Sequence, residues 1–211
     1  MTKRAALGVM SLVAGLCSVV AGITTLHAPG RAPADAGVLP AATSPASPAV
    51  PSVPPASRVP RLPPAPATMP VRLVVPALEV DAPVDPSGVS RNGELGIPAD
   101  PARVGWWIGS ARPGAAQGTV LLAGHVDTAA DGPGVLFRLE SLPMGSRVQV
   151  RTGGRAQDYR VTARRSYVKR RLPADLFRAG GTPRLVLITC GGSFHDGAYS
   201  DNVVVYAEPL R

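Results

Sequence analysis

Residues 71–211 carry their apolar side chains in short runs, and this spacing limits the folds that they can adopt. Clusters of Gly, Pro and Asp separate the runs. Short apolar or alternating runs between such turn residues predict β-strands. The predicted strands are Arg72–Val75, Thr119–Ala123, Arg147–Arg151, Gln157–Ala163, Leu185–Thr189 and Asn202–Ala207. Short strands at this density favour a mostly β domain, a closed or nearly closed antiparallel barrel, and only Leu136–Leu142 resembles a short helical turn.

Residues 28–70 are too rich in proline to continue that pattern. They hold 13 of the 24 prolines of the chain and few bulky apolar residues. Such a composition lacks the apolar surface to form a core. We therefore expect a disordered, Pro/Ala-rich linker with a polyproline-like backbone, which extends by about 3.1 Å per residue and reaches on the order of 130 Å.

The N-terminus has the pattern of a membrane segment. Lys3 and Arg4 precede the uncharged stretch Ala5–Leu26, and spanning a bilayer takes about 20 predominantly apolar residues. Positive charge on the N-terminal flank favours a cytoplasmic N-terminus, so the rest of the chain is expected outside the cell. A signal peptide cleaved near Ala28 is the alternative interpretation.

The predicted organisation is therefore an N-terminal signal-anchor or transmembrane helix (1–27), a linker (28–70) and a folded domain (71–211). The chain has a net charge of +8, but residues 71–211 hold 17 Lys or Arg against 13 Asp or Glu, a net of +4. The densest basic cluster consists of Arg164, Arg165, Lys169, Arg170 and Arg171. No zinc-finger or helix-turn-helix spacing accompanies this cluster, so we expect a solvated strand and loop face and no nucleic-acid partner.

Cys190 is the one cysteine of the predicted folded domain. Exported domains usually pair their cysteines, so a lone thiol is a structural thiol, half of an intermolecular disulfide, or a reactive nucleophile. Cys190 directly follows the apolar run Leu185–Thr189 and precedes Gly191 and Gly192. Glycines allow a sharp turn and a close approach of substrate, which favours the nucleophile.

A nucleophilic cysteine needs a partner that lowers its pKa from about 8.5. His125 follows the predicted strand Thr119–Ala123, so a sheet that aligns the two strand ends would bring it to Cys190. His195 lies in the polar stretch Ser193–Ser200 and is expected to be solvated. No ligand spacing indicates a metal, so the predicted site is His125 and Cys190, without metal or cofactor.

Several motifs jointly resemble one known family. They are VGWW (104–107), PGAAQGTVLLAGHVD (113–127), ITCGGSF (188–194) and YSDNVVVYA (199–207). A strand ending in LITC, together with an earlier strand ending in GH, is similar to the sortases, and the further motifs resemble the class F-like sortases of actinobacteria. This resemblance spans about residues 71–207 and implies a closed eight-stranded sortase-type β-barrel with short helices.

The resemblance also implies an activity, a cysteine transpeptidation at the cell wall. Cys190 would attack a carbonyl within the C-terminal sorting signal of a secreted protein, and an amine of a peptidoglycan precursor would resolve the acyl-thioester. His125 would transfer protons. Thr189 could contact the reacting groups or serve only as a strand residue, and Asp127 could orient His125 or be an exposed turn residue.

The implied protein is a single-pass protein of the cell membrane with an extracellular catalytic domain. Two alternatives stay open: a hydrolytic cysteine endopeptidase of the same fold, and a catalytically impaired wall-facing binding or scaffold domain. The family pattern places an arginine where this chain has Ser200. Either another arginine replaces it, such as Arg112 or Arg138, or backbone N–H groups of the two glycines after Cys190 act with the Ser200 hydroxyl.

Overall fold

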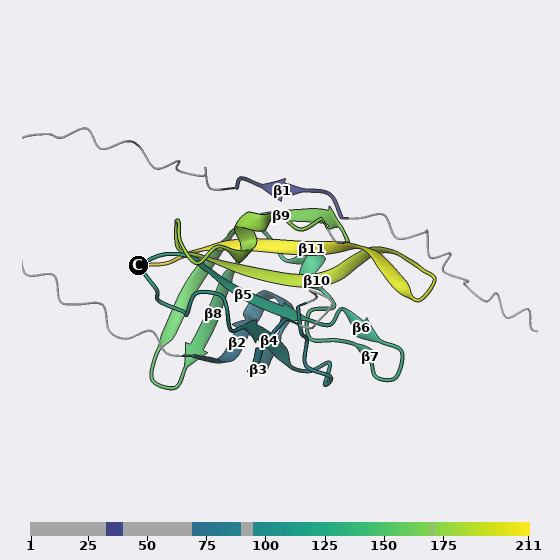
Figure 1. Cartoon of the computed structure of the whole chain (residues 1–211), viewed down its shortest axis with the longest axis horizontal. Coiled ribbons are helices and arrows are strands. Elements are labelled where there is room, and N and C mark those ends of the chain that lie inside the picture. Colours follow the sequence, from purple (N-terminus) through teal and green to yellow (C-terminus); the bar gives the residue numbers. More distant parts are fainter. Residues whose placement is uncertain (1–32, 40–68, 90–94, 170) are drawn as a thin grey trace, which may run out of the picture.

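The computed structural model describes residues 33–39, 69–89, 95–169 and 171–211 (Figure 1). In chain order the elements are β1 (Ala36–Gly37), β2 (Pro70–Val75), η1 (Pro76–Leu78), β3 (Val80–Ser87), β4 (Val104–Trp107), β5 (Thr119–Gly124), β6 (Asp127–Thr128), β7 (Gly132–Pro133), η2 (Leu139–Ser141), β8 (Arg147–Thr152), β9 (Ala156–Val168), η3 (Ala174–Phe177), β10 (Arg184–His195) and β11 (Ala198–Pro209).

Eight of these strands form a closed barrel. Their order is β9-β11-β10-β5-β4-β3-β2-β8, and β8 pairs with β9 to complete the circle. The predicted mostly β, eight-stranded barrel with short helices is confirmed. A separate β6–β7 hairpin lies at the end of the barrel toward which the β10–β11 hairpin projects (Figure 1).

The barrel is not purely antiparallel, and the prediction was wrong on this point. β5 runs parallel to β10, and β3 runs parallel to β4. A parallel pair needs a long crossover connection rather than a hairpin turn. Residues 125–183 supply that crossover between β5 and β10 by way of β6 to β9 and η3.

The central strands are buried on both faces, which explains their continuous apolar runs. Every residue of β5 is buried. One face of β5, β10 and β11 points into the barrel core, with Leu122, Leu187 and Val205. The other face packs under the β9–β10 connection, with Leu121, Val186 and Leu176 of η3 in one cluster.

Arg184 links η3 to the strands that it covers. Arg184 at the start of β10 donates through Nε to the Thr119 hydroxyl at 2.9 Å and through Nη2 to the Asp175 carbonyl at 2.7 Å. The guanidinium carbon also lies 5.6 Å from the centre of the Tyr206 ring. These contacts hold η3 over the strands that carry the candidate site.

All six predicted strands are present, and two further strands of the eight-stranded barrel were missed. β3 carries Pro83 and Pro86, and proline inside an apolar run argues against a central strand. The short β4 coincides with the VGWW motif and gives too little pattern to detect. Within the predicted helical turn, only Leu139–Ser141 forms a 3₁₀ turn.

The predicted membrane segment 1–27 lies outside the described residues, as does most of the linker. None of the helices in the described ranges combines the length and apolar character needed to cross a membrane. Residues 33–39 of the predicted disordered linker depart from the expectation, because β1 pairs with β9. No strand pattern marks these residues in the sequence, because the partner strand β9 supplies most of the groups that stabilise β1.

Candidate active site

The parallel pairing of β5 and β10 brings the two predicted catalytic positions together. The ladder ends with Ile188 opposite Ala123. Two residues beyond this last pair, Cys190 lies within β10 and His125 directly follows β5. Neighbouring strands lie about 4.8 Å apart, and side chains two residues apart share a face. The register therefore directs Cys190 and His125 to the same outer side of the barrel.

The buried Thr189 links β10 to β5 one residue beyond the last backbone pair. The Thr189 hydroxyl donates to the Gly124 carbonyl oxygen at 2.9 Å, and Thr189 is 3% exposed. The bond ties the residue before Cys190 to the residue before His125. Thr189 thus holds the two strand ends side by side.

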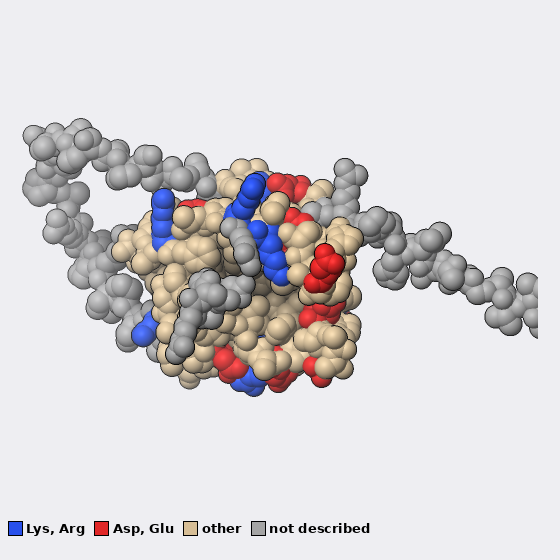
Figure 2. Space-filling model, turned by 45° about the vertical axis from the view of Figure 1, so that its right-hand side comes forward, with Lys and Arg blue, Asp and Glu red and all other residues tan. Residues whose placement is uncertain are grey.

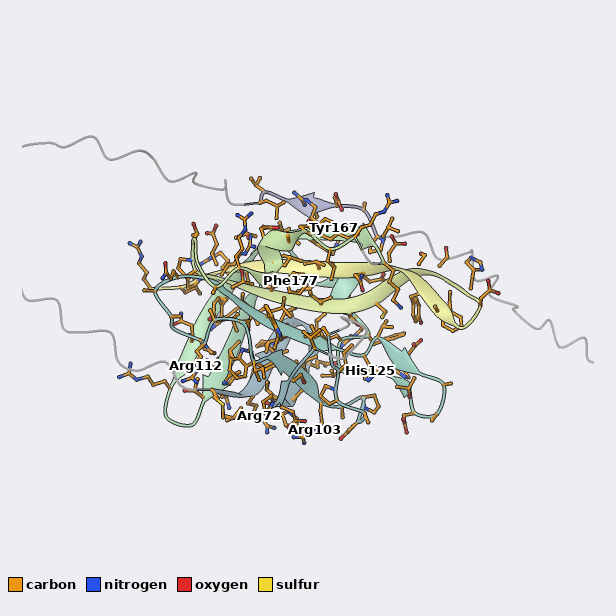
Figure 3. The ribbon with its side chains drawn as sticks, viewed as in Figure 1. Arg72, Arg103, Arg112, His125, Tyr167 and Phe177 are labelled. Carbon is orange, nitrogen blue, oxygen red and sulfur yellow. The ribbon has the colours of Figure 1, made fainter. Side chains whose placement is uncertain are left out.

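The His125 ring is oriented by the β3–β4 connection. Its Nε2 lies 2.9 Å from the carbonyl oxygen of Pro98. A carbonyl only accepts hydrogen bonds, so Nε2 carries the hydrogen of the neutral ring. This tautomer leaves Nδ1 as the acceptor that can take a proton. His125 is half-buried, and Figure 3 shows it on the side of the barrel where β6 begins.

Cys190 is a free, partly exposed cysteine at the wall of a pocket of about 380 Å³ at this end of the barrel. The pocket is lined by Val126, Phe137, Arg138, Glu140, Ser141, Thr189, Cys190, Gly191, Gly192, Tyr199 and Val203. The Cys190 thiol is therefore accessible to a ligand that enters this pocket.

The chain after Cys190 adopts a conformation that requires glycine. Gly192 has a φ of +78°, and a Cβ there would overlap the Asp201 carboxylate and the Ser200 hydroxyl. The β10–β11 ladder is irregular between Gly191 and Phe194. The two glycines therefore open the hairpin next to the thiol. The exposed His195 lies near the hairpin tip, as expected for a solvated residue.

Asp127 contacts a residue that the sequence analysis did not single out. The Tyr199 hydroxyl donates to the Asp127 carboxylate at 2.5 Å. Burial, followed by the Asp127 hydrogen bond and the negative charges of Asp127 and Cys190, raises the pKa of Tyr199 to about 12. The phenol thus stays neutral and bridges β6, just after His125, to β11. Asp127 is half-buried rather than an exposed turn residue.

Ser200 occupies the position of the family arginine, and its hydroxyl is engaged locally. It accepts a hydrogen bond from the Ser193 backbone N–H at 3.0 Å and donates to the Asp201 carboxylate at 2.5 Å. The sequence from 191 to 210 contains neither Lys nor Arg. A positive charge at this site must therefore come from another segment.

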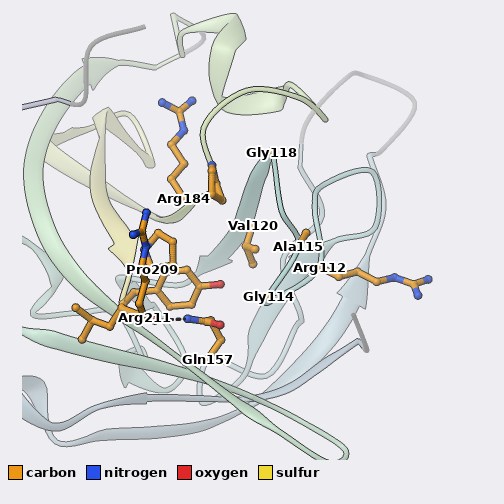
Figure 4. Close-up of a pocket in the computed structure, with 12 residues that line it drawn as sticks. Arg112, Gly114, Ala115, Gly118, Val120, Gln157, Arg184, Pro209 and Arg211 are labelled. Atoms are coloured by element: carbon orange, nitrogen blue, oxygen red, sulfur yellow. Dashed lines mark hydrogen bonds between the residues drawn. The ribbon is translucent and has the colours of Figure 1, made fainter. Parts of the chain in front are cut away.

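The structure separates the two arginines considered as replacements. Arg138 lines the Cys190 pocket, and its Nη2 donates to the Leu78 carbonyl at 2.6 Å and to Glu79 at 3.1 Å. Arg112 lines a different pocket of about 260 Å³, where β5 and β10 begin and β11 ends. Figure 3 shows Arg112 and His125 on opposite sides of the barrel, and in Figure 4 the Arg112 guanidinium points away from its own pocket.

The described surface carries both signs of charge. On the face in Figure 2, the Lys and Arg side chains form separate groups, with Asp and Glu side chains beside them. Among the described residues, no three His, Cys, Asp or Glu side chains gather as metal ligands would.

Comparison with solved structures defines the fold class. The protein is similar to sortase A from Corynebacterium diphtheriae in a lid mutant, with a TM-score of 0.53, 17% identity and coverage of 70% of this chain and 73% of that one. It is also similar to sortase C-1 from Actinomyces oris, with a TM-score of 0.51, 23% identity and coverage of 66% and 73%. The barrel therefore has the sortase fold.

The family follows from the sequence match. A family model described as the sortase domain matches residues 73–210, so the chain belongs to the sortase family, whose members are cysteine transpeptidases. The comparison with curated proteins gave no match.

Proposed function

We propose that this sortase is a membrane-anchored cysteine transpeptidase of the class F-like type, with Cys190 as nucleophile and His125 as its proton-transfer partner. The observation that carries the proposal is the parallel β5–β10 register, which ends at Ile188 and Ala123 and so brings positions 125 and 190, two residues further on, to one face of neighbouring chain segments. The pocket at Cys190 and the tautomer set by Pro98 support the same assignment.

The reaction has two steps. His125 takes the proton of the Cys190 thiol at Nδ1, the resulting thiolate attacks a backbone carbonyl in the sorting signal of a secreted protein, the C–N bond breaks, and an acyl-thioester forms. His125 gives a proton to the departing amine. An amine of a peptidoglycan precursor then attacks the thioester, His125 takes a proton from it, and the thiolate leaves. The net change is the exchange of one amide for another.

The negative charge that develops on the substrate oxygen needs hydrogen-bond donors or a nearby cation. Arg138 is the arginine that lines the Cys190 pocket, and we assign it the electrostatic part of this role. Its bonds to Leu78 and Glu79 fix the guanidinium beside the pocket. Backbone N–H groups after Cys190 supply the direct donors, because the open hairpin places them next to the thiol.

The proposed location is the cell membrane, with the barrel outside the cell. Lys3 and Arg4 before an uncharged stretch support this orientation. The N-terminal segment would then remain as the anchor of the mature protein.

A trapping assay on the purified full chain tests the proposal. The chain is incubated with a library of sorting-signal peptides, with and without an added amine, and the Cys190 adduct is identified by mass spectrometry. We expect a thioester adduct that is lost in Cys190→Ala and a product that contains the added amine. Product that is independent of amine would instead identify a hydrolase. No adduct, together with a Cys190 thiol that is inert to thiol reagents near neutral pH, would identify a scaffold domain.

A further inference from the structure

Part of the predicted linker adds a strand to the barrel. β1 pairs antiparallel with β9, with Ala36 opposite Arg164 and Gly37 opposite Ala163. The Val38 backbone N–H continues the ladder to the carbonyl of residue 162 at 3.1 Å. On its other edge, the same part of β9 pairs with β11. β1 therefore occupies the edge that β8 leaves open beyond its own pairing with β9 (Figure 1).

Arg165 clamps the backbone of this segment. Its guanidinium donates to the Ala36 carbonyl at 2.6 Å and to the Gly37 carbonyl at 2.9 Å. Its Nε also lies 3.8 Å from the Asp35 carboxylate. The Arg165 side chain is only 19% exposed. The expectation of a solvated basic face is therefore wrong for Arg165, because this arginine holds the linker.

Ser166 forms hydrogen bonds with the beginning of the same segment. Its backbone N–H donates to the Asp35 carboxylate at 3.0 Å, and its hydroxyl donates to the Pro33 carbonyl at 2.9 Å. A carboxylate that accepts a backbone N–H at an otherwise open strand edge is a specific contact. A proline-rich tether without Asp35 would lack this hydrogen bond.

Gly37 is the residue that fits the segment to the barrel. It has a φ of +75°, and a Cβ at this position would overlap the Thr162 carbonyl oxygen and crowd Ala163. A larger residue would suffer both a strained backbone and a direct clash. The aspartate and the glycine together make residues 33–39 complementary to the edge of β9.

The docked segment begins at the same end of the barrel as Cys190. Pro33 contacts Ser166, Ser166 lies opposite Val203 on β11, and Val203 lies opposite Thr189 on β10. Thr189 directly precedes Cys190. Three strand spacings of about 4.8 Å separate β1 from β10, so the tether reaches the barrel about 14 Å from β10 at the level of the site.

We propose that the open edge of β9 is the docking site for this chain's own residues 33–39, and that docking turns the Cys190 end of the barrel toward the membrane. Residues 28–32 alone then join the docked segment to the predicted membrane segment, a span of roughly 16 Å at 3.1 Å per residue, against on the order of 130 Å for the whole linker. The orientation rests on the proposed membrane anchor; the docking does not.

Hydrogen exchange on the full chain in detergent tests the docking. The Ser166 amide reports it directly, because Asp35 is its acceptor. We expect Gly37→Val to accelerate Ser166 exchange by about tenfold or more, since local opening no longer has to break the β1 contacts. The Val204 amide inside the barrel should stay protected, and Gly30→Val, in the same tether outside 33–39, is the matched control. Unchanged Ser166 exchange in Gly37→Val would overturn the docking.

Spin-label distances in lipid nanodiscs test whether residues 33–39 of the same chain occupy the β9 edge and hold the preceding residues in place. Labels are placed at Ala28→Cys and Gly153→Cys in a chain with Cys17→Ser and Cys190→Ser. We expect a narrow distance distribution that becomes broad with Gly37→Val. A narrow distance lost when labelled protein is diluted with unlabelled protein would identify a second copy as the occupant and overturn docking within one chain. Neither measurement needs catalysis, so an inactive enzyme would reject the proposed function and leave this inference standing.

Discussion

Thr189→Val is a direct test of how the barrel assembles its site. Thr189 is buried, and its hydroxyl bonds to the Gly124 carbonyl at 2.9 Å, one residue before Cys190 and His125 on their strands. Valine keeps the branched shape and the strand propensity but removes the donor. The substitution therefore isolates one hydrogen bond that holds the two strand ends in register.

The magnitude follows from burial. Removing one partner of a buried hydrogen bond costs about 1–3 kcal/mol, because the remaining carbonyl loses its donor without regaining water. For a chain of this size the melting temperature should fall by roughly 2–12 °C. Thr152→Val is the matched control, because the Thr152 hydroxyl makes the same kind of bond to the Arg155 carbonyl at 3.0 Å in an exposed turn. Its cost should stay within about 0.5 kcal/mol.

Two measurements read out the change. Thermal unfolding gives the stability loss, and peptide cleavage gives kcat/KM, which should drop by about tenfold or more because a small displacement of reacting groups is costly. Thr189→Ser keeps the hydroxyl and should recover much of the activity. If Thr189→Val matched Thr152→Val in both stability and activity, the register bond would not position the site.

Three further predictions concern the site and the core; two are checked by kcat/KM and the third by absorbance during unfolding. Arg138→Gln should lower kcat/KM by about tenfold by removing a cation beside the developing charge, whereas Arg112→Gln at the other pocket should leave it unchanged; equal effects would remove Arg138 from the site. Ser200→Arg should raise kcat/KM by up to about 10²-fold by restoring a donor, and a flat or lower value would mean that the site is already supplied. Burial raises the pKa of Tyr159 and of Tyr206 above the usual value. The neutral phenols therefore stabilise the fold fully below about pH 10 and lose that contribution as the pH rises through their raised pKa values, so tyrosinate absorbance should appear together with unfolding; a gradual titration of the folded protein would contradict this.

The sequence was sufficient for strands that carry a strong apolar pattern. β5 and β10 are covered on both faces, so their residues form continuous β-branched and leucine runs. β3 was missed because its prolines obscure the pattern, and β1 was missed because its stability comes from Arg165 and Ser166 of another strand. Local sequence records what a segment prefers, and these two strands depend on their partners.

The candidate site, like the fold, was predicted only in part from the sequence. Cys190 and His125 were predicted as site residues because each lies at the end of an apolar run, and a glycine flanks each of them. The residues that surround them in the structure were not predicted from the sequence. Pro98 acts through its backbone carbonyl, and Tyr199 acts through a bond to Asp127 on a strand far away in sequence. Contacts made by backbone atoms or by distant chain segments have no fixed spacing from which to infer them.

The direction of one strand pair decides whether this site can exist. In an antiparallel pair, the carboxyl ends of two neighbouring strands lie at opposite ends of the sheet, so residues that follow each strand cannot meet. β5 and β10 are parallel, and their carboxyl ends reach the same end of the barrel. A wholly antiparallel barrel, as the strand pattern alone suggested, would have separated a thiol beyond the paired part of β10 from an imidazole after a neighbouring β5. The long crossover from 125 to 183 is therefore a requirement of the site, because only a connection of that length lets the chain return and lay β10 parallel to β5.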